Sequence, residues 1–258
     1  MIQVTYPIIE GAEEFFFRGS ETGILICHGF VGTPQSVRQI AEKIHKSTGC
    51  TIFAPRLKGH GTCETDLSLC SHQDWFENLV QSYHHLKKYC SRIYVIGQSM
   101  GGTLALKLAS SGYDIAGIIT INAAVQIPGY DCYREAGCSG FIQEGSPDIN
   151  QPIEDEITYS RVPLSAVQEL LQLIDSTKER LRKVICPALL IKSIHDHVVP
   201  HEATDLIYHS ISSLNKSIIT LEKSFHVATM DCELKKIIAS IKRFISDTEK
   251  NLSIERIS

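Results

Sequence analysis

Short apolar runs rich in β-branched residues recur along the chain, and stretches with helical spacing separate them. Continuous apolar runs are typical of strands buried on both faces, and their alternation with helices is typical of a mostly parallel sheet. The predicted strands are 23–28, 51–55, 93–97, 115–121, 188–193 and 217–221. The pattern therefore predicts an α/β fold whose central sheet is covered by helices on both faces.

Helical spacing fills the intervals between these strands. Segment 34–47 opens with Pro34 after Thr33, which predicts a capping residue followed by proline in the first turn. The apolar positions of one helix face follow at Val37, Ile40, Ala41 and Ile44. Similar patterns predict helices over 73–90, 100–111, 201–212 and 232–246. We expect residues 3–17 to form an antiparallel edge pair leading into the sheet.

One stretch, residues 124–182, interrupts the alternation because it contains no convincing central strand. We interpret it as a cap inserted into a single domain that spans residues 1–258. Its first part is rich in Gly, Pro and Ser, and its second part, 164–183, has the spacing of an amphipathic helix. The apolar stripe of that helix is Leu164, Val167, Leu170, Leu171 and Ile174. The stripe either packs on the sheet domain or lines a pocket, and one helix can do both.

Composition narrows the class of protein. The chain has 258 residues and a net charge of −4, and its basic residues are scattered, so nucleic-acid binding is not expected. Nine cysteines without a C-x-x-C pair indicate reduced thiols, and no export signal is visible at the start, so we expect a cytoplasmic protein. The longest nearly apolar run, Ile115 to Val125, is far shorter than the roughly 20 residues of a membrane span.

The sequence G-Q-S-M-G at 97–101 lies directly between a predicted strand and a predicted helix. This is the context of a nucleophile elbow, in which small residues on either side of the serine leave room for a very tight turn. The elbow places Ser99 at a helix N-terminus, where the Met100 N–H can donate to an oxyanion. The alternative interpretation is a glycine-rich turn that caps a helix.

A second oxyanion donor is expected from the loop after strand 23–28, which reads H-G-F-V-G-T-P. We predict the Phe30 N–H as this donor, with Gly29 and Gly32 allowing the backbone to turn inward. Each well-aimed donor stabilises a transition state by about 2.7–4 kcal/mol. His28 is predicted to be a structural hydrogen-bonding residue rather than a catalyst.

A serine nucleophile needs a base, and the base needs an acid that fixes its tautomer. In this type of fold the order is Ser, then Asp or Glu, then His, each after a strand. Asp196 follows strand 188–193 and His226 follows strand 217–221, so we predict Asp196 as the acid and His226 as the base. The alternative is that both are loop hydrogen-bonding residues.

The segment H-D-H at 195–197 also suggests a metal site, because His and Asp are metal ligands. Alternate residues of an extended segment point in opposite directions, and no H-E-x-x-H or cysteine pair completes a ligand set. We therefore expect neither a metal nor a cofactor.

The chain resembles bacterial monoacylglycerol lipases and related small carboxylesterases of the α/β-hydrolase superfamily, nearly from end to end. The resemblance rests on motifs at 28–34, 55–62, 72–75, 99–104, 121–125, 186–189, 196–200 and 226–229. It implies the α/β-hydrolase fold, the triad Ser99, Asp196 and His226, and oxyanion donors at Phe30 and Met100.

The resemblance also implies a cap that covers a tunnel for one acyl chain and a small polar pocket for glycerol. By analogy Glu156 would reach the glycerol hydroxyls, although C-Y-R-E-A-G-C-S-G at 132–140 departs from the family pattern. Glu156 could instead be a solvated surface carboxylate. Leu170 and Ile174 are the candidate substrate contacts of the cap helix.

The expected reaction is hydrolysis of a carboxylic ester, most simply a monoacylglycerol, through an acyl-enzyme on Ser99. The partner is a small ester or lipid, with at most transient contact with a membrane or micelle. The alternatives are a broad-specificity short-chain carboxylesterase and a receptor that binds a hydrophobic ligand without turnover.

Overall fold

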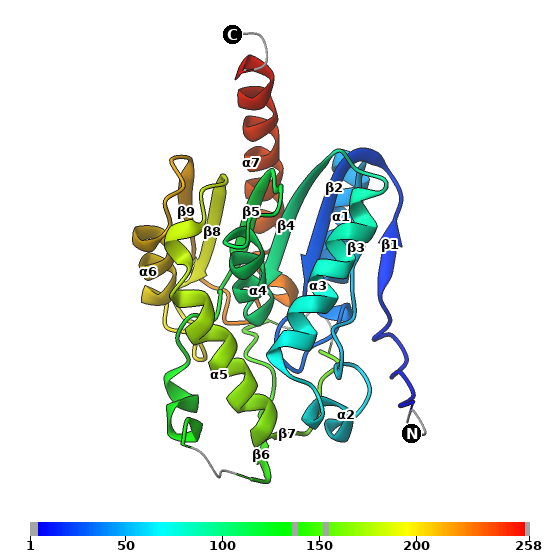
Figure 1. Cartoon of the computed structure of the whole chain (residues 1–258), viewed down its shortest axis with the longest axis vertical. Helices are drawn as coiled ribbons and strands as arrows, with labels where there is room; N and C mark the ends of the chain where they lie inside the picture. The colour runs from blue at the N-terminus through cyan, green and yellow to red at the C-terminus, as the bar shows by residue number, and fades with distance from the viewer. Residues whose placement is uncertain (1–4, 136–138, 152–154, 256–258) are drawn as a thin grey trace.

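The computed structural model describes residues 5–135, 139–151 and 155–255, with side chains up to residue 251. Within these residues seven strands form one sheet in the order β1-β3-β2-β4-β5-β8-β9 (Figure 1). Their bounds are β1 Phe15–Phe17, β2 Ser20–Cys27, β3 Cys50–Ala54, β4 Arg92–Gln98, β5 Gly117–Ile121, β8 Ala188–Ser193 and β9 Lys216–Leu221. Neighbouring strands from β3 to β9 are parallel, so the six predicted strands and their parallel arrangement are confirmed.

The N-terminal edge differs from the sequence prediction. Only Phe15–Phe17 of segment 3–17 forms a strand, and it pairs antiparallel with β3 rather than with a partner inside the segment. Residues 3 and 4 lie outside the described residues. The predicted edge pair is therefore wrong for the described residues: the chain turns at Glu10 and Gly11, where Gly11 has a φ of 86°, and the Ile9 N–H before the turn donates to the Gly61 carbonyl of a loop instead of to a strand.

Helices occupy the predicted intervals, and one short helix after β3 was not predicted. Their bounds are α1 Gln35–Thr48, α2 Glu64–Ser68, α3 His72–Lys87, α4 Met100–Ala109, α5 Leu164–Lys178, α6 Glu202–Ser210 and α7 Leu234–Glu255. Helix α1 begins one residue later than predicted, with Pro34 in the capping position and no side-chain cap. The predicted capping role of Thr33 is wrong, because its carbonyl and not its hydroxyl accepts the Ser36 N–H.

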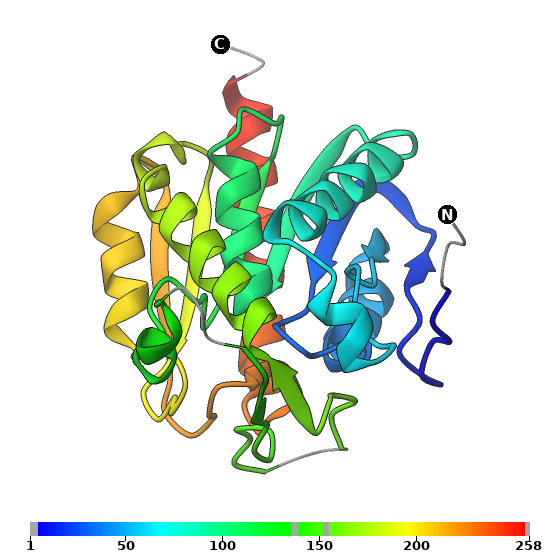
Figure 2. The ribbon, with the colours of Figure 1, turned by 60° about the horizontal axis from the view of Figure 1, so that its bottom comes forward.

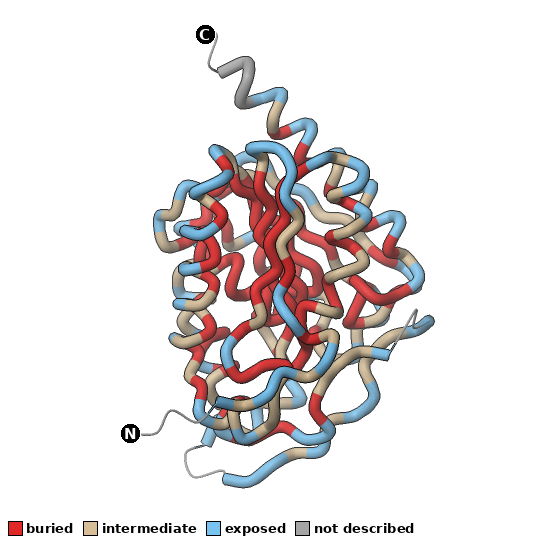
Figure 3. Tube along the Cα trace, turned by 90° about the vertical axis from the view of Figure 1, so that its right-hand side faces the viewer, coloured by how far each residue is buried: buried red, intermediate tan, exposed pale blue. Residues whose placement is uncertain are grey.

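Alternation along each strand divides the core between the two faces of the sheet. Ile24 and Ile26 of β2 belong to the core on the face of the sheet that α1 and α7 cover, whereas Leu25 and Cys27 belong to the core on the face that α3, α4, α5 and α6 cover. All four side chains are essentially inaccessible to solvent, and buried strands form the centre of the molecule in Figure 3. This two-sided burial explains why the strands read as continuous apolar runs.

The chain between β5 and β8 contributes no strand to the main sheet within the residues described. It contains the 3₁₀ helix η1 Pro128–Tyr133, the two-stranded hairpin β6 Phe141–Gln143 and β7 Arg161–Pro163, helix α5, and η2 Leu181–Lys183. Residues 136–138 and 152–154, including Cys138, lie outside the described residues. We call this connection between β5 and β8 the insertion. The parallel strands of the main sheet point downward in Figure 1 and end above the insertion, and Figure 2 shows its green segments lying in front of those ends.

Helix α5 closes this connection by packing on α3 and α4. It ends five residues earlier than the predicted 164–183, because Leu181–Lys183 forms a separate 3₁₀ turn. The last turn of the insertion then leads into β8.

Two further sequence expectations concern membranes and thiols. Among the described helices, none combines the length and the apolar character that crossing a bilayer requires. The eight cysteines in the described part of the chain are free thiols, as the sequence predicted.

Candidate active site

Ser99 lies in the sharp turn between β4 and α4, as the motif predicted. Its φ of 53° and ψ of −119° are strained for a residue with a side chain. The neighbouring glycines are required, because a Cβ on Gly97 would lie 2.1 Å from the Gly101 oxygen, and one on Gly101 would lie 2.3 Å from the Cys27 oxygen. This strained turn presents the serine hydroxyl at the carboxyl ends of the strands.

The structure brings Ser99, His226 and Asp196 into one hydrogen-bonded chain. The Ser99 Oγ lies 2.8 Å from His226 Nε2, and His226 Nδ1 lies 2.8 Å from Asp196 Oδ2. Because a carboxylate only accepts hydrogen bonds, Nδ1 carries the proton and Nε2 is left to accept the Ser99 hydroxyl proton. The tautomer is the one a general base requires.

The carboxylate of Asp196 is almost completely shielded from solvent, with 1% of its side chain exposed. Its Oδ1 accepts the backbone N–H groups of Val198 and Val199 at 2.9 and 2.7 Å, while Oδ2 faces His226. Three donors thus compensate for burial of the charge. Helix α6 begins shortly afterwards and fixes the end of this loop.

The backbone of His226 is held at both ends by residues that the sequence analysis missed. Its carbonyl accepts Gln98 Nε2 and Asn122 Nδ2, both at 2.8 Å, and its N–H donates to Asp148 Oδ2 at 3.0 Å. Gln98 immediately precedes the predicted nucleophile and Asn122 immediately follows β5, so their positions at strand ends were a usable signal. No sequence signal indicated Asp148, because it lies in the irregular part of the insertion.

The predicted oxyanion donors flank Ser99. A Cβ on Gly29 would lie 3.4 Å from the Ser99 Cβ, so the loop that carries Phe30 passes directly beside the serine. Phe30 lines the cavity in front of Ser99, and Met100 is the first residue of α4 with its side chain buried in the core. The donor roles of both N–H groups stay predictions.

His28 is structural, which confirms the prediction. Its Nδ1–H donates to the Gly29 carbonyl at 2.8 Å, and its Nε2 accepts the Leu57 N–H at 3.2 Å. Complete burial lowers the pKa of this imidazole to about 4, so it is neutral near pH 7. Both ring nitrogens are thus engaged in hydrogen bonds, and the ring fixes the Gly29–Phe30 loop.

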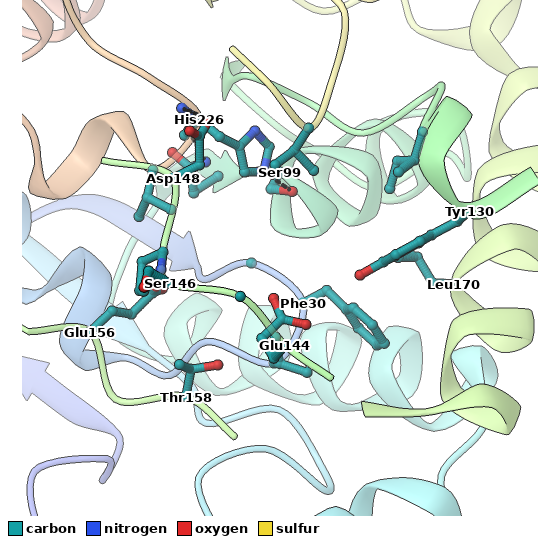
Figure 4. Close-up of a pocket in the computed structure, with 18 residues that line it drawn as sticks. Phe30, Ser99, Tyr130, Glu144, Ser146, Asp148, Glu156, Thr158, Leu170 and His226 are labelled. Carbon is teal, nitrogen blue, oxygen red and sulfur yellow. Dashed lines mark hydrogen bonds between the residues drawn. The ribbon is translucent and has the colours of Figure 1, made fainter. Parts of the chain in front are cut away.

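A cavity of about 260 Å³ opens in front of Ser99 and His226. The insertion supplies much of its wall, with Glu144, Ser146, Glu156 and Thr158 on one part and Tyr130 and Leu170 on another (Figure 4). Ser99, Phe30 and His226 line the side that belongs to the sheet. The insertion therefore covers the candidate nucleophile.

Glu156 lines this cavity, close to the backbone of Gly32, instead of lying on the surface. Burial raises its pKa to about 7, with the nearby Glu144 adding to the shift and His226 opposing it. Burial also raises the pKa of Glu144. Glu144 and Tyr130 were not predicted as site residues, because their short segments show no periodicity.

The two substrate contacts predicted on α5 lie in different surroundings. Leu170 lines the cavity, as expected. Ile174 lies one turn further along, fully buried in the core and away from the cavity lining, so its prediction as a substrate contact is wrong. Val167 is likewise a core residue.

The segment 195–197 is used for other contacts than metal ligation. Asp196 binds His226, and His197 Nδ1 lies 2.7 Å from Asp148 Oδ1. Across the described ranges no cluster of three His, Cys, Asp or Glu side chains has metal-binding geometry.

Comparison with known proteins gives a consistent group of relatives. A family model, Hydrolase_4, described as serine aminopeptidase, S33, matches residues 20–142 and 139–233. A thermostable monoacylglycerol lipase of Bacillus sp. (strain H-257) is 40% identical over 247 residues, which are 93% of this chain and 97% of that protein. A carboxylesterase of Bacillus subtilis (strain 168) is 27% identical over 237 residues, covering 90% of this chain and 95% of that protein.

Solved structures share the fold. A metagenome-derived lipolytic enzyme superposes with a TM-score of 0.88 at 33% identity, covering 95% of this chain and 100% of that one. The monoacylglycerol lipase of Paleococcus ferrophilus superposes with a TM-score of 0.75 at 14% identity, covering 90% and 98%. Both superpositions extend over at least 90% of this chain, so the chain shares the fold of these enzymes.

Proposed function

Because the chain belongs to the Hydrolase_4 family of α/β-hydrolases, we propose that it is a carboxylic ester hydrolase that cleaves monoacylglycerols into glycerol and a fatty acid. The 40% identity to a monoacylglycerol lipase over nearly the whole chain carries this proposal. The cavity in front of Ser99 supports it, because Ser99 and His226 both line it and an ester bound there would meet the serine hydroxyl.

In the first half of the proposed reaction, Ser99 attacks the ester carbonyl while His226 Nε2 takes the hydroxyl proton. The Phe30 and Met100 N–H groups hold the oxyanion, and the negative charge of Asp196 stabilises the imidazolium. Collapse of the tetrahedral intermediate breaks the ester bond, and His226 returns the proton to the leaving alcohol. The acyl group stays on Ser99.

In the second half, water replaces the alcohol. His226 removes a proton from the water, the resulting oxygen nucleophile attacks the acyl-enzyme, and the same proton returns to Ser99 as the fatty acid leaves. Atoms and charges balance without a cofactor. Asp196 takes up no proton in either half of the reaction and keeps its hydrogen bond to His226 Nδ1–H.

The substrate orientation follows from the two parts of the cavity wall. We place the acyl chain against Leu170, with the glycerol hydroxyls toward Glu156 and Thr158. Each methylene removed from water contributes about 0.8 kcal/mol, so chain length affects affinity strongly. A carboxylate that accepts hydroxyl hydrogens favours glycerol over a simple alcohol.

A second candidate function is hydrolysis of short-chain esters with broad specificity. Tyr130 and Glu144 favour it, because they place polar groups on the cavity wall where a long acyl chain would need apolar contacts. The carboxylesterase relative also supports this alternative.

Two measurements decide between these functions. Hydrolysis of a long-chain monoacylglycerol is compared with that of a butyrate ester, and a preference for butyrate defeats the lipase proposal. Fluorophosphonate labelling separates enzyme from receptor, since a folded protein that stays unlabelled at Ser99 is not a serine hydrolase. We also propose a cytoplasmic location, supported by the free thiols, with only transient contact with lipid aggregates.

A further inference from the structure

The loop that carries His226 packs against the insertion through a partly buried carboxylate. Asp148 Oδ2 accepts the N–H groups of His226 and His197 at 3.0 and 3.1 Å, and Oδ1 faces His197 Nδ1 at 2.7 Å. The Asp148 carbonyl also accepts the Val227 N–H at 3.0 Å. One residue of the insertion thus binds both the loop of the candidate acid and the loop of the candidate base.

A second carboxylate makes the same connection in the opposite direction. Asp231 is fully buried in the loop after His226, and its Oδ2 accepts the N–H groups of Phe225 and Asn150 at 2.8 and 2.9 Å. Its Oδ1 accepts the Gln151 N–H at 3.0 Å. Burial alone would raise the pKa of Asp231, but these backbone donors lower it, so the group is an anion.

We propose that Asp148 is a positioning residue for His226, so that the insertion holds the general base in place as well as covering the cavity. This inference rests on the proposed function, because it assigns His226 the role of base. Asp148 acts through the backbone N–H of His226 and takes no part in proton transfer.

The geometry explains why this contact acts on catalysis. Gln98 and Asn122 hold the His226 carbonyl, so the N–H to Asp148 is the second fixed point of the same residue. With both points fixed, the ring stays between Ser99 and Asp196 at 2.8 Å from each. A displacement of about 1 Å at a reacting group can cost about 10²-fold in rate.

The test uses Asp148→Ala and the isosteric Asp148→Asn in the full-length protein. Asparagine keeps one oxygen acceptor for the N–H groups but loses the charge that faces His197. The matched control is Asp175→Asn, the same change at an exposed residue of the insertion whose partner is Arg134. His197→Ala removes the imidazole contact while leaving the backbone donors.

We expect Asp148→Ala to lower kcat by about 10- to 100-fold on both p-nitrophenyl acetate and a long-chain monoacylglycerol, with KM changed less than about threefold. Asp148→Asn is expected to recover part of this loss, and Asp175→Asn to match wild type. His197→Ala is expected to change kcat by less than about threefold. The rate of fluorophosphonate labelling of Ser99 falls in parallel with kcat.

An unchanged kcat in Asp148→Ala overturns the proposal, and so does a loss confined to KM for the long-chain substrate, which indicates only a wall of the cavity. If the alanine variant does not fold, the Asp148→Asn variant provides the test. A fall in its kcat of at least about fivefold supports a positioning role for Asp148, and an unchanged kcat refutes that role. A wild-type protein without esterase activity defeats the proposed function, while the labelling rates still decide the role of Asp148.

Discussion

The two carboxylate oxygens of Asp196 bind different partners: Oδ2 accepts Nδ1–H of His226, while Oδ1 accepts two consecutive backbone N–H groups of its own loop. The backbone donors fix which oxygen faces the loop. The other oxygen therefore has one orientation, toward the imidazole, and that orientation sets the histidine tautomer.

Asp196→Asn follows directly from this division. The backbone N–H groups of Val198 and Val199 hold the amide oxygen at the Oδ1 position, so the amide nitrogen faces His226 and donates to Nδ1. The histidine proton then moves to Nε2, which can no longer accept the Ser99 proton. We expect kcat to fall on the order of 10⁴-fold, with KM nearly unchanged, in steady-state ester hydrolysis. A kcat within tenfold of wild type would contradict this.

Two substitutions of Ser99 are expected to differ in stability. Both remove the hydroxyl, and activity is expected to fall on the order of 10⁶-fold in each. Ser99→Ala keeps a side chain at a φ of 53°, whereas Ser99→Gly relieves the strain. Strain relief of about 1–3 kcal/mol exceeds the extra unfolded-state entropy of glycine, so urea unfolding should show the glycine variant to be more stable than the alanine variant by about 1 kcal/mol. An alanine variant as stable as the glycine variant, or more stable, would contradict this.

Glu156→Gln tests the alcohol side of the cavity. Replacing a carboxylate acceptor with an amide weakens hydrogen bonds to hydroxyl groups by about 1 kcal/mol or more. We expect kcat/KM for a monoacylglycerol to fall about tenfold relative to the methyl ester of the same fatty acid. Asp175→Asn is the matched surface control. An unchanged ratio of the two esters would exclude Glu156 as a glycerol contact.

The same residue makes stability depend on pH. The Glu156 pKa rises on folding from its ordinary 4.5 to about 7, so the folded chain holds this proton more tightly than the unfolded chain. Below pH 4.5 the acid is neutral in both states and costs nothing, and the destabilisation develops between pH 4.5 and 7. Glu156→Gln is therefore expected to be more stable than wild type by about 1–3 kcal/mol at pH 8. Thermal melts should show this gain disappearing toward pH 4.

Gly97→Ala tests the packing of the turn. The added methyl would lie 2.1 Å from the Gly101 oxygen and 2.4 Å from the Gly102 nitrogen, both backbone atoms that cannot rotate away. We expect a loss of about 3 kcal/mol or more in the free energy of unfolding, measured by urea denaturation. Gly129→Ala is the control, because its added methyl meets no atom within 4 Å.

The strands and the hydrogen-bonded chain of Ser99, His226 and Asp196 were predictable for a shared reason. Each strand is buried on both faces and so reads as one apolar run, and Ser99, Asp196 and His226 each follow such a run. Because parallel strands end at the same edge of a sheet, their order along the chain was enough to bring these side chains together. In a parallel sheet, residues that directly follow their strands in the sequence therefore lie close to one another in space.

The residues of the insertion were not predictable in this way. Asp148 and His226 are 78 residues apart, and the contact is between a side chain and a backbone N–H, which leaves no residue-type pattern. Leu170 and Ile174 belong to one apolar stripe, and periodicity does not distinguish a residue that faces a cavity from one that faces the core. The hydrophobic pattern indicates which side chains are buried, but it does not indicate which other residues cover them.

Helix α5 returns the chain from the carboxyl end of β5 to the start of β8, its parallel neighbour, while presenting Leu170 to the cavity. The sheet therefore depends on helix α5, and α5 is not a detachable lid. Chimeras made to alter ester preference must exchange residues before Leu164 only, and the donor segment must supply an aspartate at the place of Asp148. A graft that follows these junctions changes the lining of the cavity without cutting the crossover on which the fold depends.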